Sequence, residues 1–280
     1  MKIKILSLGI LVIGLVQLAC ELDGFLFNTE KIEKYQLPGN TIPLKLIEEV
    51  TFKSGDYALF GYWVKTSNNR RGLTVLYSHG NKHHIDEYWD RVMYLHQLGV
   101  NVFIYDYRGF GRSEGESSEK ALYEDGEAAL NYVLSHFTVL PDSLIIYGYS
   151  LGNVPAIYQA AGQIRPLCLI SEAPFASANS LTQGSTIIDI PPRWLTEGEF
   201  DNIKYIKQIN TPFLLLHGEA DDFVRFRDNG KVLFENAPEP KKLLLVPKAN
   251  HGDIPETMKI ENYLQALNQW VEFSVKYQRK

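Results

Sequence analysis

The 280-residue sequence predicts an α/β protein whose mostly parallel sheet is covered by helices on both faces. The first observation is that short apolar runs of strand character alternate with segments whose apolar residues recur at helical spacing. The second is the pentapeptide Gly148-Tyr149-Ser150-Leu151-Gly152, which follows an apolar run and precedes a helix-compatible one. The third is composition: 45% apolar and 22% charged residues suit one large globular domain with a sizeable core.

The strands are predicted from apolar runs bounded by turn residues. Two of these runs flank the turn sequence Ser54-Gly55-Asp56, which indicates an antiparallel hairpin. The later runs are separated by helical or longer segments, which favours parallel pairing. The predicted strands cover residues 50–52, 57–64, 72–78, 100–105, 144–147, 167–171, 212–217 and 243–247.

The helices are predicted from apolar stripes and end signals. The first follows residue 84, carries Ile85, Trp89 and Val92 on its apolar side, and is ended by Gly99. The next begins at a cap-like Ser117-Ser118-Glu119 and runs to residue 137. Residues 155–161 form the helix after the pentapeptide, and 255–277 form the last one.

One connection is unusually long. About 40 residues separate the strand that ends near 171 from the one that starts near 212, where such links usually take a handful. This segment, about 173–210, carries apolar residues that include Ile187, Trp194 and Phe200. Two interpretations stay open: a surface excursion packed on the body, or a small lid whose apolar face borders a site.

Charge and cysteine content exclude several classes of function. The net charge of −5 and a pI near 5.8 argue against a nucleic-acid partner, since there is no basic surplus to neutralise phosphates. The two cysteines, Cys20 and Cys168, cannot build a disulfide framework, and Cys168 lies in an apolar run where it reads as a small buried hydrophobe. No cluster has metal-ligand spacing, so neither a metal nor another cofactor is expected.

The N-terminus has the pattern of an export signal. Two lysines precede a 14-residue apolar stretch, residues 5–18, which is short for a bilayer span and typical of a signal-peptide core. The stretch ends in Leu18-Ala19-Cys20, which resembles the lipobox of bacterial lipoproteins and makes Cys20 the candidate lipidation site, although Gln17 departs from that pattern. We therefore expect residues 1–20 to be a lipoprotein-type signal, 21–46 an extension, and 47–280 the catalytic domain. An uncleaved anchor and simple secretion are the alternatives, and all three place the domain outside a bacterial cytoplasm.

The pentapeptide predicts a nucleophile. A sharp strand-to-helix turn forces the central Ser150 into a strained conformation that exposes its hydroxyl, and the flanking glycines allow the two arms to approach. A serine hydroxyl is a poor nucleophile without a base and an orienting acid, which follow on this plan in the order acid, then histidine. Asp221 and His251 stand in that order, each just past a predicted strand.

Competitors for the acid and the base remain. Asp222 adjoins Asp221, and Asp253 lies further along, so either could orient the histidine. Among the seven histidines, His217 precedes Asp221 and is expected to be structural. His83 and His84 could touch substrate near the mouth of the site, but a solvated pair is expected. His96 and His136 fall on predicted helices and are expected on the surface or satisfied in the core.

Two backbone groups are candidates for an oxyanion hole. The N–H of Leu151 lies at the start of a helix, where amide donors are unpaired and the helix dipole favours negative charge. The second donor is expected from His79-Gly80-Asn81 after the 72–78 strand, with the N–H of Asn81 as the candidate.

The motifs together resemble the α/β-hydrolase superfamily from about residue 47 to the C-terminus. His79-Gly80-Asn81, the run 105–115, Gly148–Gly152 and the run 217–221 match its landmarks in order and spacing. The resemblance implies a mostly parallel eight-stranded sheet with helices on both faces, a small lid insertion and a cofactor-free serine hydrolase. Within the superfamily the chain is similar to membrane-associated hydrolases that include protein depalmitoylases, and to serine aminopeptidase-like hydrolases.

The resemblance also assigns supporting roles. Asp106 and Arg108 are expected to tie the loop beside the oxyanion hole and not to react. Asn153 and Asn250 replace glycines that are common beside the nucleophile and the histidine. A serine at the elbow argues against relatives that use an aspartate nucleophile.

The sequence therefore predicts a membrane-tethered hydrolase of carboxylic esters or thioesters, which would be its small-molecule partners. A serine peptidase of aminopeptidase type is the first alternative, with Glu172 as the obvious group to hold a substrate amine. A non-catalytic binding protein on the same scaffold is the second. The presence of all three candidate triad residues argues against it.

Overall fold

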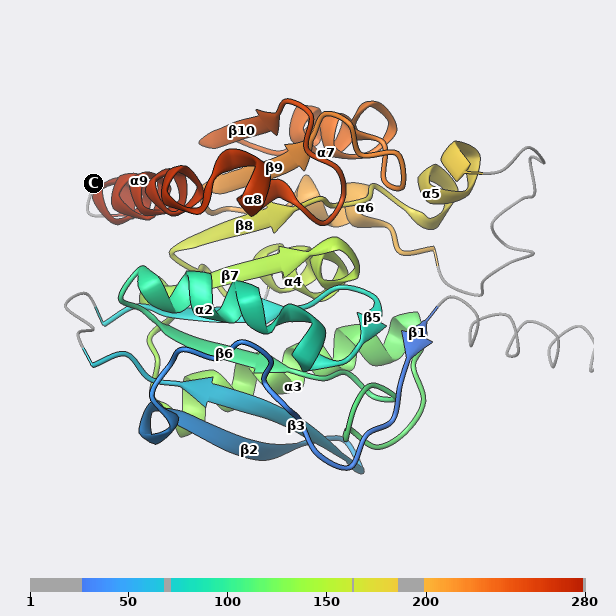
Figure 1. Cartoon of the computed structure of the whole chain (residues 1–280). Helices are drawn as coiled ribbons and strands as arrows, with labels where there is room; N and C mark the ends of the chain where they lie inside the picture. The colour runs from blue at the N-terminus through green and yellow to red at the C-terminus, as the bar shows by residue number, and fades with distance from the viewer. Residues whose placement is uncertain (1–26, 68–71, 163, 186–198, 279–280) are drawn as a thin grey trace, which may run out of the picture.

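The computed structural model describes residues 27–67, 72–162, 164–185 and 199–278, so the signal-like segment and Cys20 lie outside the described residues. An eight-stranded sheet with the order β10-β9-β8-β7-β4-β6-β3-β2 forms its centre (Figure 1). The expected hairpin is confirmed as the antiparallel pair β2 and β3, and β3 is also antiparallel to β6. From β6 to β10 every neighbouring pair is parallel. The strands of this sheet are β2 (Ile47–Ser54), β3 (Tyr57–Val64), β4 (Thr74–Ser78), β6 (Asn101–Tyr105), β7 (Leu144–Tyr149), β8 (Cys168–Glu172), β9 (Phe213–Gly218) and β10 (Lys241–Val246).

Helices cover both faces, as predicted. Figure 1 shows α2 and α9 on the near side of the sheet and α3 and α4 on the far side. The helices are α2 (Trp89–Gln97), α3 (Glu119–His136), α4 (Asn153–Ala160), α5 (Ala178–Ser185), α6 (Asn202–Ile206), α7 (Gly230–Asn236), α8 (Ile254–Met258) and α9 (Ile260–Gln278). The predicted cap of α3 is confirmed, since the Ser118 hydroxyl accepts a hydrogen bond from the Ala121 amide at 3.1 Å.

The alternation of side chains along the strands divides the core into two clusters. On β4, Leu76 belongs to the cluster with α3 and α4, whereas Val75 and Tyr77 belong to the cluster with α2 and α9. This is the pattern of a parallel strand buried on both faces. Cys168 is fully buried in the second cluster, as expected.

Three features differ from the sequence prediction. The segment predicted to form one last helix forms two helices, because Lys259, with φ +66°, separates α8 from α9. The short helices α5, α6 and α7 were not predicted. Nor was the two-residue parallel pair of β1 (Asn28–Thr29) with β5 (Lys82–His83), which places the N-terminal extension beside the His79-Gly80-Asn81 loop.

The long link has described ends and an undescribed middle. Residues 186–198, which include Ile187 and Trp194, lie outside the described residues, so the choice between lid and surface excursion stays a prediction. The returning end is fixed on the body: the Glu119 carboxylate accepts from the amides of Glu199 and Phe200, both at 2.7 Å. Phe200 is buried between Phe27 and Phe175.

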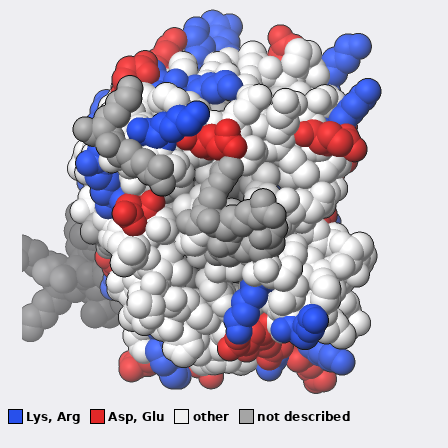
Figure 2. All heavy atoms as spheres, turned by 90° about the vertical axis from the view of Figure 1, so that its left-hand side faces the viewer, with Lys and Arg blue, Asp and Glu red and all other residues white. Residues whose placement is uncertain are grey.

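Surface charge is mixed. On the face shown in Figure 2, the acidic and basic side chains of the described residues intermingle around a broad area of other residues. Such a face does not offer the basic stripe that binds nucleic acid. None of the helices in the described ranges has the length and apolar character needed to cross a bilayer.

Candidate active site

The pentapeptide forms the predicted strained turn. Ser150 directly follows β7 and has φ +49°, which is rare for a residue with a side chain. A Cβ on Gly152 would lie 1.9 Å from the Ser78 carbonyl oxygen, and one on Gly148 would lie 2.8 Å from the Asn153 Cα. Both glycines are therefore required by close backbone approach, and the backbone at Ser150 is strained as the sequence predicts.

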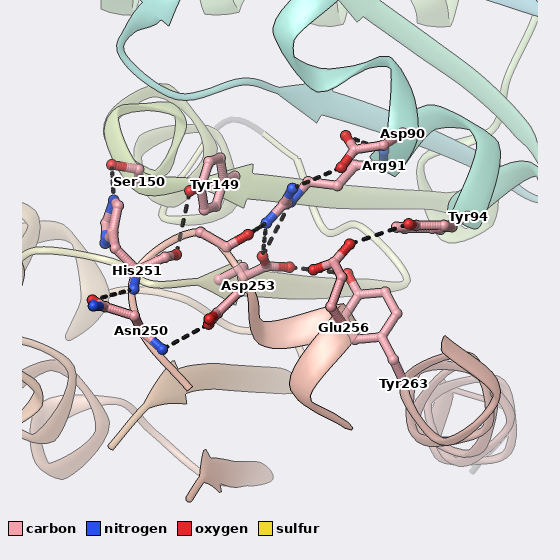
Figure 3. Close-up of polar contacts among 12 residues, drawn as sticks. Asp90, Arg91, Tyr94, Tyr149, Ser150, Asn250, His251, Asp253, Glu256 and Tyr263 are labelled. Carbon is pink, nitrogen blue, oxygen red and sulfur yellow. Dashed lines mark hydrogen bonds and ion pairs between the residues drawn. The ribbon is translucent and has the colours of Figure 1, made fainter. Parts of the chain in front are cut away.

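The structure brings the three predicted triad residues together. His251 Nε2 lies 2.9 Å from Ser150 Oγ, and His251 Nδ1 lies 2.8 Å from Asp221 Oδ2. Figure 3 shows His251 reaching from its loop to Ser150. The three side chains come from the loops after β7, β9 and β10, which meet at the carboxyl edge of the sheet.

Asp221 is held in place by its own turn. Its Oδ1 accepts from the amides of Phe223 at 3.1 Å and Val224 at 2.7 Å, which leaves Oδ2 for His251. Burial of the carboxyl acts to raise its pKa, but hydrogen bonds from His217 and His251 and from the Val224 amide outweigh it and lower the pKa well below the usual range. Asp221 is therefore ionised at neutral pH.

The competing residues occupy other positions. Asp222 is exposed next to Asp221, while Asp253 accepts from the Asn250 amide at 2.7 Å and shapes the histidine loop (Figure 3). His217 is fully buried, with Nε2 2.7 Å from the Val224 carbonyl, in the structural position that the sequence indicated.

The other histidines lie away from Ser150. His83 faces Glu30 and Glu87, and His84 is only 8% exposed. The expectation of a solvated pair is therefore wrong for His84. His96 Nε2 lies 3.1 Å from the Lys65 carbonyl. His136 is exposed and stacks on a tyrosine of the same helix.

The two oxyanion candidates lie beside Ser150. Leu151 follows Ser150 in the first turn before α4, and Asn81 lines the same pocket as Ser150. A Cβ on Gly80 would lie 3.0 Å from both the Tyr149 ring and the Tyr88 hydroxyl, so the loop runs close against the elbow. The Asn81 side chain accepts from the Asn28 amide at 3.0 Å, a brace that the sequence did not predict.

The neighbouring loop is tied down by buried pairs. His79 Nε2 lies 3.0 Å from Asp106 Oδ1, and the other oxygen of Asp106 accepts from the Tyr35 hydroxyl at 2.6 Å. The Arg108 side chain and amide both bind Asp125, at 2.6 and 2.7 Å. These contacts fit the supporting roles expected of Asp106 and Arg108.

Asn153 has a clear task in place of the usual glycine. Its side-chain amide donates to the Ser150 carbonyl at 3.1 Å and to the Glu172 carbonyl at 3.0 Å. It therefore joins the elbow to the end of β8. Asn250 acts similarly in the histidine loop, where its Oδ1 accepts from the His251 amide at 2.8 Å.

A pocket of about 480 Å³ opens at Ser150 and His251. Its wall combines polar and charged groups with the aromatic rings of Tyr88, Tyr149 and Phe223. It includes residues that sequence reasoning missed, among them Arg91 of α2 and Asn28 of the N-terminal extension. The lining residues are Asn28, Asn81, Lys82, Glu87, Tyr88, Asp90, Arg91, Tyr149, Ser150, Phe223, His251 and Gly252. Phe223 is 62% exposed, and its ring centroid lies 5.1 Å from that of His251, so it offers an apolar edge beside His251.

Glu172, the candidate group for holding a substrate amine in the peptidase alternative, is not available for that role. The side chain is fully buried, with Oε1 bound to Arg91 and Oε2 to the hydroxyls of Tyr147 and Tyr263. Both oxygens are occupied inside the protein. Among the described residues no group of three or more His, Cys, Asp or Glu side chains is arranged to hold a metal ion.

Comparison with known proteins adds to this geometry. The family model of serine aminopeptidase, S33, matches residues 69–197, and that of the PhoPQ-activated pathogenicity-related protein matches 197–277. The uncharacterized protein YfhR of Escherichia coli O157:H7 is 31% identical over 238 residues, which cover 79% of this chain and 81% of that protein. Human alpha/beta hydrolase domain-containing protein 17B is 32% identical over 210 residues, covering 75% of this chain and 69% of that protein.

Solved structures share the architecture at low identity. The esterase Pf2001 of Pyrococcus furiosus superimposes with a TM-score of 0.68 at 19% identity, covering 88% of this chain and 98% of that one. Est1E of Butyrivibrio proteoclasticus, solved with ferulic acid bound, gives a TM-score of 0.64 at 18% identity, covering 82% and 100%. These likenesses show the fold.

Proposed function

Because the chain belongs to the α/β-hydrolase superfamily, we propose that it is a serine hydrolase that cleaves carboxylic ester or thioester bonds through an acyl-enzyme. Hydrolase activity in general follows from the family. The observation that carries the finer proposal is the continuous path from Ser150 Oγ through His251 to Asp221, at 2.9 and 2.8 Å. Such a path activates a serine hydroxyl for acyl transfer.

The proposed reaction proceeds in two halves. Ser150 Oγ attacks the carbonyl carbon while His251 Nε2 takes the hydroxyl proton, and Asp221 stabilises the imidazolium through Nδ1. The N–H groups of Leu151 and Asn81 are proposed to stabilise the negative oxygen of the tetrahedral intermediate. His251 returns the proton to the leaving alcohol or thiol. A water molecule, deprotonated by His251, then attacks the acyl carbon, and the acid leaves with Ser150 restored.

Labelling with a fluorophosphonate probe tests the nucleophile. The wild-type protein is expected to label, whereas Ser150→Ala is expected not to. A wild type that does not label would overturn the serine hydrolase and favour the non-catalytic binding protein. Because the probe needs only an activated serine, this test is independent of the natural substrate.

Amide hydrolysis is the second candidate. The pocket that holds Ser150 also carries the carboxylates of Glu87 and Asp90, which could face a substrate amine. Both already have cationic partners, since Glu87 pairs with Lys82, and Asp90 lies 3.3 Å from Arg91. This pairing favours the ester reading. A fluorogenic panel of acyl esters and aminoacyl amides distinguishes ester hydrolysis from amide hydrolysis. Faster turnover of the amides would refute the proposal of ester hydrolysis.

Membrane attachment is a separate proposal. A lipid on Cys20 would tether the domain in the cell envelope, and the diacyl and N-acyl modification of lipoproteins gives firm anchoring. Asn28, only eight positions further on, lines the pocket. Eight residues span at most about 29 Å, so the pocket would stay within about 30 Å of the membrane surface. Mass analysis of the mature protein from membrane fractions tests this, and an intact Met1 would refute it.

A further inference from the structure

Arg91 of α2 is a buried cation in contact with the histidine loop. Its exposed fraction is 4%, and its Nε and Nη2 donate to Glu172 Oε1 at 3.1 and 2.8 Å. Nη2 also donates to the carbonyl of Gly252 at 2.8 Å. Gly252 directly follows His251, so this guanidinium joins the end of β8 to the loop that carries the base.

Glu172 fixes Arg91 from behind. Its second carboxylate oxygen accepts from the hydroxyls of Tyr147 on β7 and Tyr263 on α9, the latter at 2.9 Å. Burial raises the pKa of both tyrosines well above the usual value, so both remain protonated donors. Every oxygen of Glu172 is therefore matched by a donor, and the carboxylate can hold the guanidinium in one orientation.

Arg91 reaches the elbow as well as the histidine loop. Its guanidinium carbon lies 4.4 Å from the centroid of the Tyr149 ring, and Tyr149 directly precedes Ser150. The Tyr149 hydroxyl in turn donates to the His251 carbonyl at 3.3 Å. The two successive carbonyls of His251 and Gly252 are thus bound by one group of side chains, which is anchored on the strand that presents Ser150.

The loop has a separate internal support. Asp253 accepts from the Asn250 amide, and Asn250 accepts from the His251 amide, at 2.7 and 2.8 Å. These bonds set the shape of the turn. The Ala249 carbonyl accepts from the Ala220 amide at 2.9 Å, which ties the start of the loop to the turn after β9, and none of these three bonds reaches β7. Figure 3 shows Arg91 on the opposite side of the loop from Asn250, between the loop and α2.

A buried ion pair is weak evidence for stability, since apolar replacements are often as stable. The contacts of Arg91 with Gly252 and Tyr149 indicate a role other than stability for the ion pair of Arg91 with Glu172. We propose that Arg91, oriented by Glu172, is a positioning residue that holds His251 at hydrogen-bonding distance from Ser150. It acts on the proposed hydrolytic reaction without touching the reacting atoms.

The test is Arg91→Lys. A lysine keeps the charge for Glu172 but lacks the planar fork that contacts Glu172 and Gly252 together. We expect kcat for a soluble acyl ester to fall about 10- to 100-fold, since a base displaced by about 1 Å can cost about 100-fold. Because Arg91 also lines the pocket, KM is expected to change as well, but by less than kcat. Hydrogen exchange of the 250–253 backbone is expected to accelerate.

Arg112→Lys is the matched control. Arg112 also pairs with a carboxylate, Glu49, and lies over an aromatic ring, Phe60, at 4.3 Å, yet it is not part of the pocket wall. We expect this variant to keep kcat within about twofold of wild type. Glu172→Gln keeps the shape of the side chain that holds Arg91 and is expected to give a smaller fall in kcat than Arg91→Lys. If Arg91→Lys does not fold, the kcat of Glu172→Gln tests the positioning role instead.

The outcomes separate this proposal from the proposed function. If wild type neither labels at Ser150 nor hydrolyses the ester, the proposed function fails. If wild type is active and Arg91→Lys and Glu172→Gln both match Arg112→Lys in kcat and in exchange, only the positioning role is overturned.

Discussion

Replacing the proposed orienting acid by its amide, Asp221→Asn, tests the role of that residue at constant shape. Oδ1 of Asp221 must accept from two amides, those of Phe223 and Val224, so an asparagine there keeps its oxygen in that position. Its NH₂ group then faces His251 Nδ1, which would have to accept a hydrogen bond instead of donating one. The ring proton would move to Nε2 and point at Ser150 Oγ, in the tautomer that cannot take the serine proton.

The expected magnitude follows from this tautomer. Loss of the base in an otherwise intact serine triad lowers kcat by about 10⁴-fold, equivalent to about 5 kcal/mol of transition-state stabilisation. The assay is kcat for a chromogenic ester, with circular dichroism to confirm that the variant folds. KM is expected to change little, because the pocket wall is unaltered.

Asp222→Asn is the control, since Asp222 is the adjacent, exposed carboxylate. We expect it to retain wild-type activity. The reasoning is refuted if Asp221→Asn keeps more than about a tenth of the wild-type kcat, or if Asp222→Asn loses as much. The second result would make Asp222 the orienting acid, as the sequence alone allowed.

Further predictions concern stability, specificity and cofactors. The pKa of Asp221 is lowered in the folded state, so its ionised form contributes stability that is present above about pH 4 and lost below it; urea unfolding should therefore depend less on pH under pH 4 in Asp221→Asn than in wild type. Gly152→Ala places a methyl group 1.9 Å from the Ser78 backbone oxygen and should lower the free energy of unfolding by at least about 3 kcal/mol, whereas Gly162→Ala, with no atom within 4 Å, should stay within about 0.5 kcal/mol of wild type. Phe223→Ala removes apolar surface beside the nucleophile; if an acyl chain covers about 50 Å² of that ring, kcat/KM for octanoyl over acetyl esters should fall about tenfold, and an unchanged ratio would exclude Phe223 from the acyl site. Incubation with EDTA should leave esterase activity unchanged, because no proposed step uses a metal, and a loss restored by a divalent ion would contradict the mechanism.

The sequence predicted the strands, the elbow and the order of the candidate triad because those signals are local or follow from topology. An apolar run, a glycine-bounded serine and a helical stripe lie within about 20 residues of one another. Asp221 and His251 lie far apart along the chain, yet each follows a parallel strand, and parallel strands deliver their ends to one edge. Their proximity could be expected without any side-chain coordinates.

The missed features depend on contacts that leave no local pattern. Arg91 meets the Glu172 carboxylate 81 residues away and the Gly252 carbonyl 161 residues away. Nothing beside Arg91 in the sequence distinguishes it from a solvated helix residue. Glu172 looked available for a substrate amine for the same reason. The break before α9 falls at Lys259, which no glycine or proline signals, so periodicity alone joined two helices.

Residues that shape a single loop and residues that connect different loops have separate roles in the candidate site. The loop that carries each candidate triad residue has a local device: close glycine approach at Ser150, a two-amide turn at Asp221, and the Asn250-Asp253 turn at His251. Each device shapes its own loop but cannot set the distance between loops. The distance of 2.9 Å between atoms on the β7 and β10 loops depends on contacts between those loops. Tyr149 supplies one through its hydroxyl on the His251 carbonyl, and Glu172, at the end of β8, supplies another through Arg91. Because turn shape and loop spacing rest on different residues, variants of Asn250 and of Arg91 should alter the site in separable ways.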